Sequence, residues 1–86
     1  MLSYCARYVD SVITRRWTYS FQDDRVFCEL SHHGGAFEMR TFRPQQAPNE
    51  HVERYDDLTP ALLRQCELEA ALIGCGWTLE NYAVER

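Results

Sequence analysis

The sequence predicts an α+β fold in which one helix from the C-terminal half packs on one face of an antiparallel β-meander of four to five strands, in the order β-β-β-(β)-α-β. Two patterns lead to this prediction. Apolar and polar residues alternate along residues 12–40 in three runs separated by turns, as in half-buried strands. Residues 60–74 instead repeat apolar side chains at helical spacing. We expect residues 1–86 to form a single domain with one core.

The first two strands are predicted to form a hairpin. A polar turn at residues 22–25 joins them, and the proximity of the two runs in the sequence favours antiparallel pairing. Their apolar faces carry Ile13, Trp17, Tyr19 and Phe21 in the first run and Val26, Cys28 and Leu30 in the second.

A second turn and a third strand extend the meander. Residues 32–35 read His-His-Gly-Gly, and glycine adopts the positive φ of tight turns without a steric cost. Phe37 and Met39 then alternate with charged residues. The proline-containing residues 43–49 suit an exposed loop, and residues 51–55 suit a short edge strand.

The helix is predicted over residues 60–74. Thr59 fits the N-cap, Pro60 fits the first helical position, and two aspartates lie near the positive end of the helix dipole. Gly74 and Gly76 indicate its end, and the alternation after Trp77 indicates a last strand that returns to the sheet. Residues 1–11 fit a strand slightly better than a helix.

Composition restricts the classes of function. The formal net charge of −4 and the acidic C-terminal half weigh against electrostatically driven binding of nucleic acid. All nine basic residues are arginine, which excludes lysine chemistry such as Schiff bases and P-loops. No apolar run is long enough to cross a bilayer and no signal peptide is evident, so we expect a cytoplasmic protein with no membrane partner.

The predicted helix carries more apolar surface than one small sheet covers. At about 100° per residue, one arc forms a core stripe, and a second arc lies roughly 150° away. We interpret the second arc as a homodimer interface, because a two-fold axis buries the same patch on both protomers; cover by another part of the same chain is the alternative. The core stripe is Leu62, Leu63, Cys66, Ala70 and Ile73, and the second arc is Ala61, Leu68 and Leu72, with Gln65 among them.

The outer face of the sheet offers an alternative function. Arginines interleaved with aromatic rings bind single-stranded nucleic acid in some sheets. Here the outer charges alternate in sign, so a solvated face is the simpler interpretation. The candidate residues for a ligand or nucleic-acid face are Arg16, Phe27, Arg40, Phe42 and Arg43.

Nothing in the sequence supports catalysis or a cofactor. The four cysteines form no close pair, which favours buried free thiols over disulfides or structural zinc. Residues 31–33, Ser-His-His, and the carboxylates of Glu67 and Glu69 lack the geometry of a catalytic constellation. We therefore expect a small non-catalytic protein-interaction or regulatory module that forms a homodimer, with another protein as a further candidate partner.

Overall fold

The computed structural model describes residues 13–44 and 50–85, which form one antiparallel sheet and one helix. The predicted α+β meander with a single helix is confirmed, and β4 is the edge strand expected before the helix. The predicted strand in residues 1–11 lies outside the described residues. The elements are β1 (Ile13–Phe21), β2 (Asp24–His33), β3 (Ala36–Phe42), β4 (Glu50–Tyr55), α2 (Leu58–Gly74) and β5 (Thr78–Glu85).

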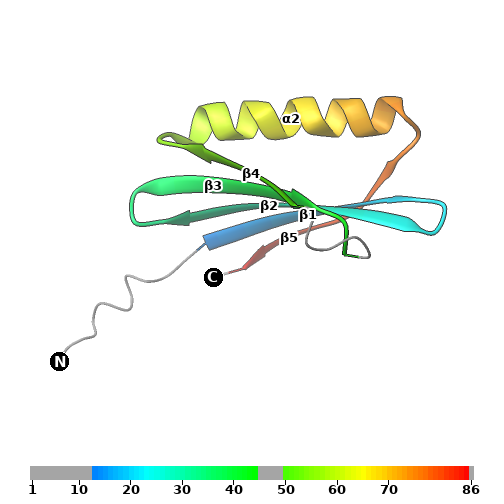
Figure 1. Ribbon diagram of the computed structural model, residues 1–86, viewed down its shortest axis with the longest axis horizontal. Helices are drawn as coiled ribbons and strands as arrows, with labels where there is room; N and C mark the ends of the chain where they lie inside the picture. The colour runs from blue at the N-terminus through cyan, green and yellow to red at the C-terminus, as the bar shows by residue number, and fades with distance from the viewer. Residues whose placement is uncertain (1–12, 45–49, 86) are drawn as a thin grey trace.

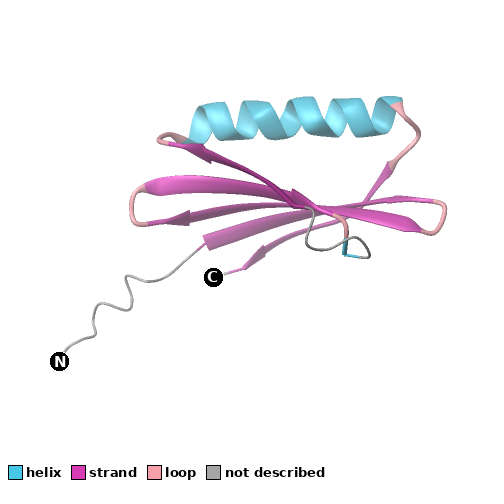
Figure 2. Cartoon of the chain, viewed as in Figure 1, coloured by secondary structure: helices cyan, strands magenta, loops and turns pink. Residues whose placement is uncertain are grey.

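The sheet order β4-β3-β2-β1-β5 places the last strand beside the first. Helix α2 leaves β4 at one edge, runs across one face and delivers the chain to β5 at the other edge (Figures 1 and 2). The described part of the molecule therefore has two layers, with the far face of the sheet uncovered by any described helix.

The hairpin turns are tighter than the sequence suggests. Only Gln22 and Asp23 separate β1 from β2, and Gln22 has a φ of 56°. Gly34 and Gly35 both have positive φ, as the type I′ turn of a two-residue hairpin requires.

Helix α2 begins and ends close to the predicted positions. It starts at Leu58, with Asp57 rather than Thr59 at the N-cap and no side-chain hydrogen bond there. At its end, the Trp77 N–H donates to the Leu72 carbonyl and the Gly76 N–H donates to the Ile73 carbonyl, each at 3.0 Å. These two bonds and the φ of 98° at Gly76 form a Schellman motif.

The predicted orientation of the helix is wrong. Ala61 is 0% exposed and belongs to the core, and Leu68 and Leu72 pack against that core within the same chain. Ala61, Leu68 and Leu72 therefore do not form the exposed dimer interface that the sequence predicts. Of the predicted core stripe, only Leu62 packs against the core, whereas Leu63, Cys66, Ala70 and Ile73 are exposed, Leu63 by 61% and Ile73 by 52%.

A polar network accounts for this orientation. The Tyr19 hydroxyl, buried in the sheet, donates to Glu69 Oε1 at 2.7 Å and accepts from Gln65 Nε2 at 2.7 Å. Gln65 is only 4% exposed, so it stands on the sheet-facing side of α2 together with Ala61 and Leu68. Burial and the Glu69 carboxylate raise the pKa of Tyr19, so the hydroxyl remains a hydrogen-bond donor.

A second network joins α2 to β4. The Glu53 carboxylate accepts from the Tyr55 hydroxyl and from Arg64 Nε, and His51 Nε2 lies 2.7 Å from its Oε2. Arg64 Nη1 also donates to Glu67 at 3.2 Å. The hydrogen bond from Tyr55, aided by those from His51 and Arg64, lowers the pKa of Glu53 to about 2. This carboxylate therefore fixes the start of the helix over the edge strand.

Candidate interaction surfaces

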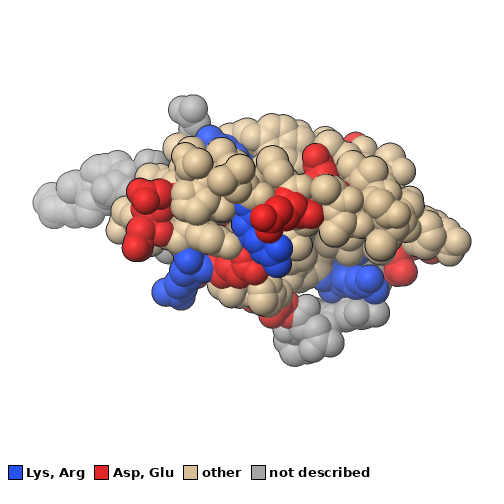
Figure 3. All heavy atoms as spheres, turned by 90° about the horizontal axis from the view of Figure 1, so that it is seen from above, with Lys and Arg blue, Asp and Glu red and all other residues tan. Residues whose placement is uncertain are grey.

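The exposed apolar stripe of α2 is the first candidate surface. It consists of Leu63, Cys66, Ala70 and Ile73, which we call the α2 outer stripe, and all four residues are exposed. Their spacing of three, four and three residues is that of alternating a and d positions in a heptad. Figure 3, which views the molecule from the helix side, shows a largely uncharged surface with charged groups scattered over it. The helix therefore carries exposed apolar surface, as the sequence predicts. This surface lies on the arc that was predicted to face the core, not on the arc that was predicted to form the dimer.

The two edges of the sheet differ in how they are protected. Edge strand β4 carries the charged side chains of Glu50, Glu53 and Arg54, which discourage pairing with another strand. Edge strand β5 has an uncharged centre over residues 81–84, and Tyr82 and Val84 are about half exposed. Among the described strands, only β1 pairs with β5. The unprotected edge of the described sheet is therefore β5.

The outer face of the sheet brings together most of the candidate nucleic-acid residues. Phe27 and Phe42 form an edge-to-face pair at 5.4 Å, and the Arg16 guanidinium lies 5.8 Å from the Phe27 ring centre. Arg16 pairs with Glu29, and Arg40 pairs with Glu38 at 3.3 Å. The positive charges of this face are thus matched by carboxylates, as alternation predicts.

Arg43 does not join that face. Its guanidinium lies 5.5 Å from the ring centre of Trp77. Trp77 follows the end of α2 in the chain and packs against the core. Arg43 therefore stands on the helix side of the sheet, and the five-residue candidate face is reduced to four residues.

The described histidines and cysteines form no reactive constellation. His32 stacks on Phe37 at 4.2 Å on the helix side, while the Ser31 hydroxyl lies 3.3 Å from that of Thr14 on the outer side. The described part of the chain contains no group of three or more His, Cys, Asp or Glu placed to hold a metal ion. Cys28 is buried, and burial raises the pKa of its thiol to about 11. Cys66 and Cys75 are free but exposed, so the expectation of buried thiols is wrong for these two.

No family model, curated protein or solved structure matches the chain. Within residues 13–44 and 50–85, no helix combines the length and apolar character needed to span a bilayer. The function is therefore argued from the surfaces above.

Proposed function

We propose that the protein is a small, non-catalytic, cytoplasmic interaction module that forms a homodimer through the α2 outer stripe. The observation that carries this proposal is the exposure of Leu63 and Ile73 at the two ends of a heptad-spaced apolar stripe. Exposed apolar side chains aligned on one face of a helix are typical of surfaces that pack against a second helix.

The order of side chains in the stripe suits an antiparallel pair of helices. A two-fold axis between Cys66 and Ala70 places Leu63 of one protomer against the partner's Ile73, and Cys66 against the partner's Ala70. Large side chains then meet at both ends and small ones at the centre, where small residues allow the helices to approach closely. Such an interface is isologous and closed, so it yields a dimer rather than a filament.

The magnitudes indicate a reversible dimer. Leu63 and Ile73 are 61% and 52% exposed. Burying the exposed part of these two side chains on both protomers contributes roughly 3 to 7 kcal/mol, from about 1.5 to 3 kcal/mol per complete side chain. Association costs roughly 4 to 15 kcal/mol. These two side chains alone offset only the lower part of that cost, so we expect a weak, reversible dimer that forms only as the protein concentration approaches about 1 mM.

Sedimentation equilibrium with charge variants tests both the dimer and its register. We expect Leu63→Glu alone and Ile73→Lys alone to give monomers, because each places two charges in the interface. The double variant L63E/I73K should recover part of the association, because each glutamate then faces a lysine of the partner. Ala71→Glu is the matched control, since Ala71 is exposed on α2 but lies outside the stripe. A wild-type chain that stays monomeric up to about 1 mM contradicts the proposal.

We also propose that the β5 edge binds an extended segment of another protein by strand addition. The uncharged centre of β5 leaves main-chain groups open to pairing, and Tyr82 and Val84 offer alternate apolar contacts on one side of the strand. The ring of Tyr82 is supported by Trp17 at a centroid distance of 5.2 Å. Selection of peptides from a display library on the wild-type protein tests this part of the proposal.

The selected peptides should lose binding to the variant Y82K/V84K, because edge lysines oppose strand addition. They should keep binding to Val52→Lys, which places a single lysine on the β4 edge, where Val52 is also exposed. Peptides that bind all three proteins equally would show that β5 is not the site.

The alternative function, binding of single-stranded nucleic acid, has weaker support. It rests on the cluster of Arg16, Phe27 and Phe42, but the arginines of that face pair with glutamates. Filter binding that weakens steeply with salt would favour this alternative over the interaction module.

A further inference from the structure

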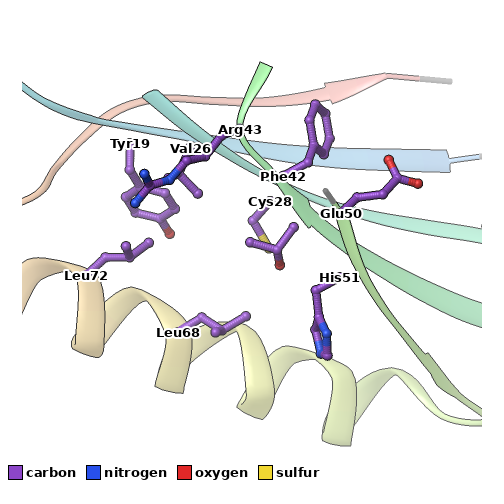
Figure 4. Close-up of a pocket in the computed structure, with 10 residues that line it drawn as sticks. Tyr19, Val26, Cys28, Phe42, Arg43, Glu50, His51, Leu68 and Leu72 are labelled. Carbon is purple, nitrogen blue, oxygen red and sulfur yellow. The ribbon is translucent and has the colours of Figure 1, made fainter. Parts of the chain in front are cut away.

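A cavity of about 520 Å³ lies between α2 and the helix-facing side of the sheet. Its size falls within the range of roughly 300 to 1,000 Å³ typical of small-molecule sites. Leu68 and Leu72 line it from the helix, and Tyr19, Val26 and Cys28 line it from the sheet. Figure 4 shows these side chains directed into the space between the two layers.

Most polar groups of the cavity are already satisfied within the chain. The Tyr19 hydroxyl bonds to Glu69 and Gln65 at 2.7 Å each. His51 is 2.7 Å from the Glu53 carboxylate. Glu50 points away from the helix in Figure 4, and its carboxylate lies 3.4 Å from Arg40 Nε.

Arg43 is the exception. Five of the other six described arginines pair with carboxylates, whereas no described carboxylate lies within ion-pair distance of Arg43 or of Arg15, and Arg15 lines a different cavity. Residues 45–49, which follow it closely in the chain, contain no Asp or Glu. Arg43 lines the cavity and is held over the Trp77 ring, next to the end of α2. The five paired arginines are Arg16, Arg25, Arg40, Arg54 and Arg64.

We propose that this cavity binds a small amphiphile with one carboxylate head and an apolar body. The apolar body lies against Leu68, Leu72 and Val26, where it replaces water on apolar surface. The head binds Arg43, because a planar guanidinium donates two parallel hydrogen bonds to a carboxylate. This site is separate from the α2 outer stripe and from the β5 edge, so it does not depend on dimer formation.

Titrations followed by amide and methyl NMR shifts test the site, with decanoate, decanol and decyltrimethylammonium as probes below their micelle-forming concentrations. We expect decanoate to bind most tightly and to shift the signals of Val26, Leu68 and Leu72. Arg43→Gln should weaken decanoate binding by about tenfold or more and leave decanol binding unchanged. Arg54→Gln, which makes the same charge change at a strongly exposed residue, should have no effect.

Three results would overturn the proposal. The first is absence of decanoate binding at about 1 mM. The second is equal affinity for decanoate and decanol, with no effect of Arg43→Gln, since the guanidinium would then not bind the carboxylate head group. The third is a set of shifts confined to Leu63 and Ile73, which would place the probe on the α2 outer stripe. As a check on folding, Arg43→Gln should keep the wild-type pattern of amide signals away from the cavity.

Discussion

Replacement of Tyr19 by phenylalanine should destabilise the protein strongly, although it removes a single oxygen atom. The Tyr19 hydroxyl ties β1 to α2 through Gln65 and Glu69, each at 2.7 Å. A hydrogen bond to a charged group contributes about 1.5 to 3 kcal/mol, and a neutral one contributes about 0.5 to 1.5 kcal/mol. Loss of both therefore lowers the free energy of unfolding by about 2 to 4 kcal/mol.

Urea unfolding, followed by circular dichroism, measures this loss. In a domain of this size about 1 kcal/mol corresponds to about 4 to 8 °C in Tm, so thermal unfolding provides a second readout. Tyr82→Phe is the matched control, because Tyr82 is about half exposed on β5 and no described group bonds to its hydroxyl. It should change the stability by less than about 0.5 kcal/mol.

A double variant distinguishes the hydrogen-bond network from simple packing. Y19F leaves the Gln65 amide buried without its acceptor, whereas Y19F/Q65L replaces both partners by apolar groups and removes that penalty. We expect a coupling of about 1 kcal/mol or more between the two sites. A Y19F protein within about 0.5 kcal/mol of wild type, or additive effects of the two changes, would refute the network as the determinant of helix orientation.

Three further predictions concern stability. Leu68→Ala should lower the free energy of unfolding by about 1 to 3 kcal/mol because the side chain packs on the core. Leu63→Ala should lower it by less than about 0.5 kcal/mol in the diluted monomer. If urea unfolding gave the reverse order, the helix orientation predicted from the sequence would be correct. The pKa of Glu53 is lowered from 4.5 to about 2, so its contribution of about 2 to 3 kcal/mol is present above pH 4.5 and is lost as the pH falls towards 2; Glu53→Gln should flatten this part of the stability profile, and an unchanged profile would argue against the ion network. Gly76→Ala should cost about 1 to 3 kcal/mol, because φ is 98° and a Cβ atom would lie 3.1 Å from the Phe21 ring; a Tm equal to that of the wild type would contradict this.

The strand pattern was predictable because alternation and turn residues are local signals. The residues of β1 and β2 that alternate in the sequence pair across the sheet as expected, with Trp17 opposite Cys28 and Tyr19 opposite Val26. Phe27 and Phe42, which the alternation leaves on the outer face, pack against each other there.

The orientation of the helix was not predictable from hydrophobicity alone. The buried face includes Gln65 and the partly buried Glu69, both bonded to Tyr19 from a distant strand. The exposed face includes Leu63 and Ile73. An apolar residue is not obliged to be buried, and a polar residue can be buried when it has a partner. The cavity could not be predicted from the sequence either, because its lining residues come from β1, β2, α2 and the ends of β3 and β4, which are distant from one another in the chain.

The rate of Cys66 alkylation tests the central claim of self-association most directly. Cys66 lies at the centre of the α2 outer stripe, while Cys75 is exposed beyond the end of α2 and provides an internal reference. Brief iodoacetamide labelling, read by mass spectrometry of peptides, compares the two thiols from about 1 μM to about 1 mM protein. The account predicts that labelling of Cys66 slows relative to Cys75 as concentration rises, and that Leu63→Glu abolishes this protection. A ratio that stays constant over the whole range would contradict a dimer built on this face of the helix.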